Sequence, residues 1–168
     1  IWFIAFLYGA HIVGFYALAN RTINLPASFI SDSFSRVFFE RAAVEKRESG
    51  SSIKIFKKVF ITLSAISILP FIFIWTFGAK IFSLVFGSFW DTAGTIAAIM
   101  APLSWIRFVV VPLSLVTFVH EKQEFLLCWQ LGLALISGGS LYIASRYFSD
   151  INTVLTIFSI SLCCWYLI

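Results

Sequence analysis

The sequence predicts an all-α protein, a polytopic transmembrane helix bundle of about five full spans and one partial span. Its composition, its long apolar runs and the grouping of its basic residues predict this fold. Of the 168 residues, 60% are hydrophobic and only 12% are charged, with a mean hydropathy of +0.96. A soluble domain is typically about 25% charged. The composition therefore excludes a disordered chain, a nucleic-acid-binding domain and most soluble enzymes, whereas a bilayer accommodates so much apolar surface.

The apolar runs set the order of the spans. A spanning helix needs about 20 mostly apolar residues. Residues 1–9 are too short to cross alone and are predicted as the end of a truncated helix. Because the chain begins and ends inside apolar runs and lacks an initiator Met, we expect a fragment of a longer membrane protein. The five full spans are expected at residues 13–36, 58–79, 92–119, 124–146 and 151–168.

The connections between these spans predict their arrangement. The segments 120–124 and 146–150 have five residues each, which is typical of antiparallel neighbours in a bundle. The longer segment 80–91 is apolar but bounded by charge, so we expect it to lie at the membrane interface. Trp75 and Trp90 would anchor it there.

The basic residues predict the orientation. Residues 36–58 carry seven of the twelve Lys/Arg and three acids, so this segment alone accounts for the net charge of +4. A basic run can bind nucleic acid, but between two apolar runs it is typical of a cytoplasmic loop. Placing it inside leaves eight Lys/Arg on the cytoplasmic side and two, Lys80 and Arg146, outside. Residues 37–57 and the C-terminus are therefore expected on the cytoplasmic side.

No motif in the chain predicts catalysis or metal binding. The two histidines are far apart, and Cys128, Cys163 and Cys164 lie in apolar runs with no zinc or redox spacing. No Gly-rich phosphate loop follows a strand, and no paired carboxylates share a helical face. We therefore expect no enzyme activity, no catalytic residue, no metal and no cofactor.

A polar stripe marks the span 13–36. Two interpretations stay open: the stripe lines a hydrated cavity, or it makes interhelical hydrogen bonds while Arg21 snorkels outward. The rarity of an arginine inside a membrane favours the cavity and makes Arg21, Asn24 and Ser28 candidate substrate contacts. Asp32 and Arg36 are expected to form an i,i+4 ion pair. The stripe consists of Arg21, Asn24, Ser28, Ser31 and Ser35, at alternating spacings of 3 and 4, opposite Phe15, Leu18, Ile23, Phe29 and Ile30.

Arg107 is the second candidate contact. It lies near the middle of the span 92–119, between Pro102 and Pro112, which remove backbone hydrogen bonds from the helix. Charges inside a membrane are usually functional, so this position predicts a site for an anionic group. The alternative is an arginine paired with a carboxylate outside this sequence. In the next span, Gln130, Ser137 and Gly138-Gly139 predict helix packing, with the two glycines allowing a close helix approach.

Two blocks of sequence resemble a known transporter family. The first block is VGFYALANR at 13–21, LP at 25–26 and VFFERAA at 37–43. The second is FG at 86–87, Trp90, AG at 93–94, Pro102, Pro112 and KQ at 122–123. Together they resemble the polysaccharide flippases of the multidrug/oligosaccharidyl-lipid/polysaccharide (MOP) superfamily, the Wzx-type exporters of O-antigen and lipid-linked oligosaccharides. Many relatives have Pro or Gln where this chain has Glu40.

The resemblance implies a fold and a function. It implies two pseudo-symmetric helix bundles around a central cavity, worked by alternating access, with this chain as most of the C-terminal bundle. Undecaprenyl-diphosphate-linked glycans would cross the bacterial inner membrane for surface polysaccharide and lipopolysaccharide biosynthesis. The implied partners are the lipid-linked glycan, membrane lipid, the N-terminal bundle and the polymerase machinery, without nucleic acid. The alternatives are a cation-coupled antiporter of the same superfamily, which would favour buried carboxylates, and a non-transporting membrane scaffold.

Overall fold

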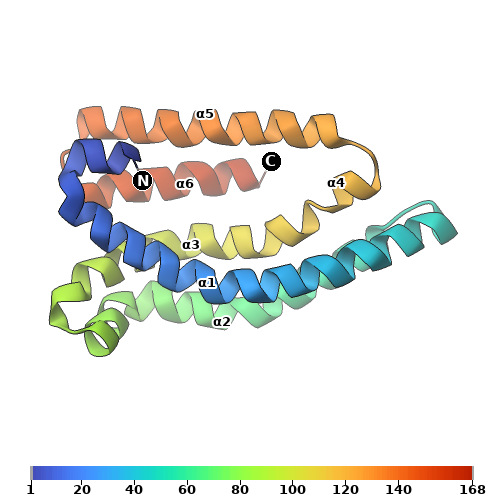
Figure 1. The fold of residues 1–168 in the computed structure, drawn as a ribbon, viewed down its shortest axis with the longest axis horizontal. Helices are drawn as coiled ribbons and strands as arrows, with labels where there is room; N and C mark the ends of the chain where they lie inside the picture. Colours follow the sequence, from blue (N-terminus) through green and yellow to red (C-terminus); the bar gives the residue numbers. More distant parts are fainter. Residues whose placement is uncertain (1, 168) are drawn as a thin grey trace.

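The computed structural model describes residues 2–167, and no strand occurs among them (Figure 1). The all-α class is thereby confirmed. In chain order the elements are α1 (Trp2–Ser49), α2 (Ile53–Phe86), the short 3-10 helix η1 (Ser88–Trp90), α3 (Asp91–Leu113), α4 (Val116–Val119), α5 (Gln123–Tyr147) and α6 (Ile151–Tyr166).

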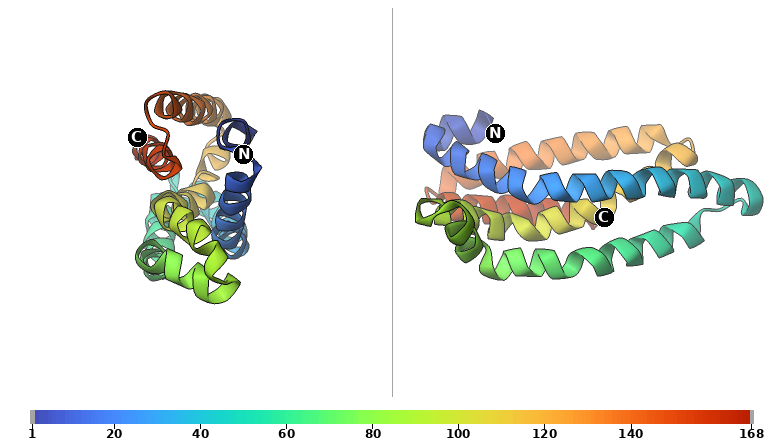
Figure 2. Two further views of the ribbon diagram at one scale, coloured as in Figure 1. Left: turned by 90° about the vertical axis from the view of Figure 1, so that its left-hand side faces the viewer. Right: turned by 60° about the horizontal axis from the view of Figure 1, so that its bottom comes forward.

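Helix α3 is the centre of the bundle. It packs against α1, α2 and α6, whereas α5 packs mainly on α6 and lies at the edge (Figures 1 and 2). The burial pattern agrees, because twelve residues of α3 are buried while Ala144 is the buried residue of α5. The α1–α2 turn and the α5–α6 loop lie at opposite ends of the long axis (Figure 1). Most side chains of α3 therefore pack against other helices, although Pro102 and Val111 are exposed.

Helix α1 joins the expected partial span and the first full span. Its backbone leaves helical geometry at Gly9, where φ is 79° and ψ is 169°, so the bend falls at the boundary between the two expected segments. A positive φ is easy for glycine and strained for other residues, which explains a bend at this position. Beyond residue 36 the helix continues to Ser49, through a segment rich in Ala, Glu, Lys and Arg, which are good helix formers.

The segment 80–91 is largely a continuation of α2, which differs from the expected separate interfacial segment. No Gly or Pro interrupts the chain between Ala79 and Phe86, so the helix runs on until Gly87. There the backbone turns with φ of 97°, and η1 leads into α3. Beside this turn Gly78 and Gly94 bring α2 and α3 into backbone contact, since a Cβ on Gly78 would lie 2.6 Å from the Gly94 carbonyl oxygen.

The expected helix 92–119 is broken near its end. Helix α3 stops at Leu113 and α4 begins at Val116, with Ser114 and Leu115 in a turn. Pro112 lacks a backbone N–H and donates no hydrogen bond to the preceding turn of the helix. The chain then makes tighter i,i+3 bonds: the Leu115 N–H donates to the Pro112 carbonyl at 3.4 Å and the Thr117 N–H to the Ser114 carbonyl at 3.1 Å. The expected helix ran through Pro112 to residue 119, and the break after Leu113 was not predicted.

Among residues 2–167, three stretches are long and apolar enough to cross a membrane, namely Ile53–Phe86, Ser88–Val119 and Gln123–Tyr147. Helix α6 is apolar but has only 16 residues, and α1, which carries the polar stripe, is not among the three. Helix α6 starts with a side-chain cap, because the Asp150 carboxylate accepts from the Thr153 hydroxyl at 2.8 Å and its N–H at 3.0 Å. These bonds hold the pKa of Asp150 below its ordinary value.

Candidate functional site around Arg107

Arg107 lies in the second half of the central helix. It follows Asp91, the first residue of α3, by 16 positions, which at 1.5 Å per residue is about 24 Å along the axis. Measured from Asp91, that distance is past the middle of a hydrocarbon core about 30 Å thick. The side chain is half-buried among α1, α3 and α6. The helix packing thus holds a permanent positive charge inside the bundle.

The neighbours of Arg107 are aromatic or weakly polar. Its Cζ atom lies 5.9 Å from the centre of the Tyr166 ring on α6, within range of a cation–π contact. Tyr16 of α1 and Cys163 of α6 are also close enough to interact electrostatically with the Arg107 guanidinium. Its Nε atom is buried and has no hydrogen-bond partner among residues 2–167. A buried donor without a partner is costly, so this N–H is available to an acceptor from outside the described chain.

The acidic residues of the chain lie away from Arg107. Asp32, the one acid within an expected span, is exposed on α1. The others are in the α1–α2 hairpin, at the starts of α3 and α5 or in the loops after α4 and α5: Glu40, Glu45, Glu48, Asp91, Glu121, Glu124 and Asp150. Arg107 therefore has no acidic neighbour within one helical turn of α3.

A cavity of about 360 Å³ lies beside Tyr166. Its walls come from α2, α3, α4, α5 and α6 and are mostly apolar, with Phe60, Leu113, Phe125 and Trp129 among the lining residues. Tyr166 thus takes part both in the cavity wall and in the contact with Arg107. Within residues 2–167 no group of three or more His, Cys, Asp or Glu side chains could hold a metal ion.

The polar stripe of α1 is divided by the tertiary structure. Arg21 and Ser28 are exposed and Asn24 is half-buried, but Ser31 is only 7% exposed and belongs to the packing face. Phe29 is 72% exposed, although the sequence placed it on the apolar side away from the stripe. The face that actually packs carries Phe15, Ala19, Ile23, Ser31 and Phe38. Ala19, a small residue that the stripe did not single out, is fully buried on this face.

The stripe residues satisfy much of their hydrogen-bonding capacity within α1. Asn24 donates from Nδ2 to the Asn20 carbonyl and side-chain oxygens, both at 2.8 Å. The Ser28 hydroxyl donates to the Leu25 carbonyl at 2.9 Å. These local bonds are common for Ser and Asn in helices and do not require a partner helix. Arg21 and Arg107 therefore occupy different environments, one exposed and one inside the bundle.

Cysteine reactivity will test which side of α1 faces water. We expect Ser28→Cys to react rapidly with a small water-soluble thiosulfonate, whereas Ser31→Cys, the same substitution three residues later, is shielded by the bundle. Phe29→Cys would stay unreactive if that exposed position faces lipid. Reaction rates are measured in membranes of a variant without Cys128, Cys163 and Cys164. Equal rates at positions 28 and 31 would contradict the packing face described above.

Two contacts that the sequence did not predict join the α1–α2 hairpin to α4. The Lys46 ammonium donates to the Val119 carbonyl at 2.6 Å, and the Ser52 hydroxyl is 2.9 Å from Nε2 of His120. These pairs are 73 and 68 residues apart in sequence, so no local pattern could reveal them. A cation at the carbonyl end of a helix also complements its dipole.

A family comparison decides the broader identity. The family model described as "Polysaccharide biosynthesis protein" matches residues 1–95, which is more than half of the chain. The chain belongs to this family. Neither the curated proteins nor the solved structures gave a significant match. The matched part of this polysaccharide biosynthesis protein covers α1, α2 and the first residues of α3, so Arg107 lies beyond it.

Proposed function

We propose that this polysaccharide biosynthesis protein is part of a flippase that moves undecaprenyl-diphosphate-linked oligosaccharides across the bacterial inner membrane. The observation that carries the proposal is Arg107, a half-buried arginine of the central helix whose Nε has no partner among residues 2–167 and which has no acidic neighbour within one helical turn of α3. Family membership supports the polysaccharide part of the proposal, and the apolar helices support the membrane part.

The chemistry of such a substrate matches the surroundings of Arg107. A diphosphate is anionic, and the planar guanidinium of arginine binds phosphate oxygens in pairs. The polyprenyl tail needs an apolar route, which the cavity beside Tyr166 would provide. In a Wzx-type cycle, a second helix bundle would close the glycan path on the other side.

The sidedness of the membrane is part of this proposal. Seven basic residues in segment 36–58 favour the cytoplasmic side for the α1–α2 turn. A cysteine at Ser51 is therefore expected to react with an impermeant thiol reagent only after the cells are opened. A cysteine at Ser149, at the opposite end of the bundle, is expected to react in intact cells. Labelling of position 51 in intact cells would reverse the orientation.

Transport by the full-length protein that contains this chain is the direct test. The protein is reconstituted into vesicles that hold an undecaprenyl-diphosphate oligosaccharide in both leaflets, and an impermeant lectin reports the glycan on the outside. We expect the inner half of the glycan to become accessible in protein-containing vesicles and to stay protected in protein-free ones. Unchanged protection would contradict the flippase, and accompanying cation-driven efflux of small drugs would favour the antiporter.

A further inference from the structure

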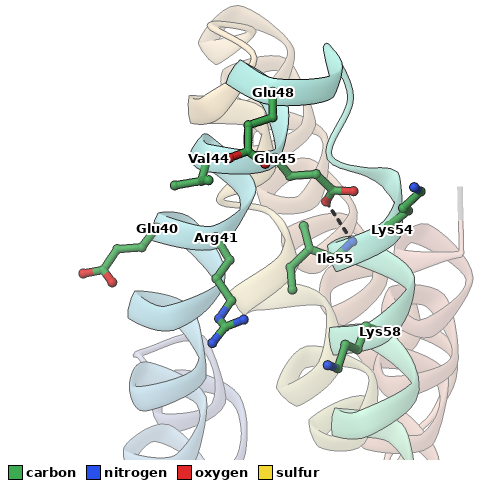
Figure 3. A pocket seen from close by; sticks show the side chains of 8 residues that line it. All are labelled: Glu40, Arg41, Val44, Glu45, Glu48, Lys54, Ile55 and Lys58. Atoms are coloured by element: carbon green, nitrogen blue, oxygen red, sulfur yellow. Dashed lines mark hydrogen bonds between the residues drawn. The ribbon is translucent and has the colours of Figure 1, made fainter.

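The α1–α2 hairpin holds two adjoining cavities that the export proposal does not use. The first, about 550 Å³, has mostly charged walls, which include Arg41, Glu45, Lys54 and Lys58 (Figure 3). The second, about 270 Å³, shares Arg41, Ile55 and Lys58 with the first. Its remaining walls are mainly apolar, with Phe34, Val37, Phe38 and Val59. We call the two cavities together the Arg41–Lys58 groove.

The groove changes from charged to apolar along the helices. Because α1 and α2 run in opposite directions from their turn, Glu48 and Lys54 lie nearest the turn, Arg41 and Lys58 follow, and Phe34 lies deepest. On the side of the α1–α2 turn, the expected spans have their edges at residues 36 and 58. Arg41 therefore lies about 8 Å beyond the edge at residue 36, at 1.5 Å per residue. Lys58 lies at the edge itself. Both cations are thus at the depth of lipid headgroups.

The two cations face a common space. Figure 3 shows the Arg41 and Lys58 side chains extending from opposite helices into the gap between them, while Glu40 points away from it. The nearby Glu45 carboxylate is engaged elsewhere, because its Oε2 accepts the backbone N–H of Ile55 at 3.0 Å and caps α2. Glu48, the third acid that lines the first cavity, lies nearer the α1–α2 turn than Arg41 and Lys58 (Figure 3).

We propose that the Arg41–Lys58 groove binds an acidic phospholipid, with its phosphate between Arg41 and Lys58 and an acyl chain along the apolar walls. Arginine supplies a planar pair of donors and lysine a compact charge, a combination suited to a phosphate diester. The apolar second cavity favours a ligand that carries a hydrocarbon chain over free phosphate. Val37, which is 53% exposed, would be covered by that chain.

Native mass spectrometry of the full-length, delipidated protein will test this site. The protein is titrated with phosphatidylglycerol and, separately, with phosphatidylcholine. Near an anionic membrane surface each Lys or Arg contributes about 1 kcal/mol, so we expect Arg41→Gln and Lys58→Gln each to weaken phosphatidylglycerol binding about fivefold. Val37→Asp, which places a negative charge in the second cavity, is expected to weaken it as well. Phosphatidylcholine binding would stay unchanged.

A matched double variant separates a site from general attraction. Arg47→Gln with Lys57→Gln removes two positive charges from exposed positions of the same segment that line neither cavity. We expect it to bind phosphatidylglycerol like the unmodified protein. An equal loss in this control would overturn the proposal in favour of non-specific attraction. Displacement of the lipid by millimolar inorganic phosphate or glycerol phosphate would also overturn it, because the site would then recognise free phosphate.

Discussion

Replacing Arg107 with alanine is expected to lower glycan export about ten- to a hundredfold while the amount of protein in the membrane stays normal. Hydrogen bonds to charged groups contribute about 1.5–3 kcal/mol, which corresponds to that range. The substitution removes the one cation whose Nε is buried without a partner among residues 2–167. Surface glycan is measured in cells whose own flippase gene is deleted, and membrane protein is measured by immunoblot.

Two companion variants make this result specific. Arg107→Lys keeps the charge but loses the planar pair of donors, so it should retain part of the activity. Arg146→Ala removes an exposed arginine near the α5–α6 loop and should leave export unchanged. If the Arg107→Ala protein disappears from the membrane, Arg107 is a structural partner of a group elsewhere in the protein. If the variant exports normally, substrate contact must be sought at another residue, such as Arg21.

Replacing Gly94 with alanine is expected to disrupt the contact between α2 and α3. The added Cβ would collide with the Gly78 carbonyl and lie 2.6 Å from the Ala79 Cα, and backbone atoms cannot move aside as a flexible side chain can. Overpacking of this kind usually costs about 1–3 kcal/mol, so we expect a clear fall in the thermal unfolding temperature and less monodisperse protein. Fluorescence-detected size-exclusion chromatography after heating measures both.

The chain offers a matched control for this glycine. Gly138 and Gly139 were expected from the sequence to allow a close helix approach, but a Cβ on either residue would meet nothing within 4 Å. Gly139→Ala lies inside α5 and should be neutral or stabilising by about 0.5–1 kcal/mol, because alanine favours the helix over glycine. If Gly94→Ala unfolds at the same temperature as Gly139→Ala, the α2–α3 contact is looser than described.

Much of the architecture could be predicted from the sequence because it depends on local composition. Long uncharged runs predict helices, and the apolar content predicts a membrane for them. Helices α5 and α6 begin and end within a few residues of the expected spans, since polar loops separate them. The position of Arg107 along its helix could also be predicted, because it follows directly from the residue count.

The tertiary structure decided which side of each helix meets a neighbour. A helical repeat places residues around an axis but does not select the side that packs, and in the structure Ser31 is buried while Phe29 is exposed. Likewise only the crossing of α2 and α3 shows that Gly78 and Gly94, not Gly138 and Gly139, allow close approach. The bonds from Lys46 to Val119 and from Ser52 to His120 depend on how distant segments meet. Such contacts join residues far apart in the chain, where no periodicity connects them.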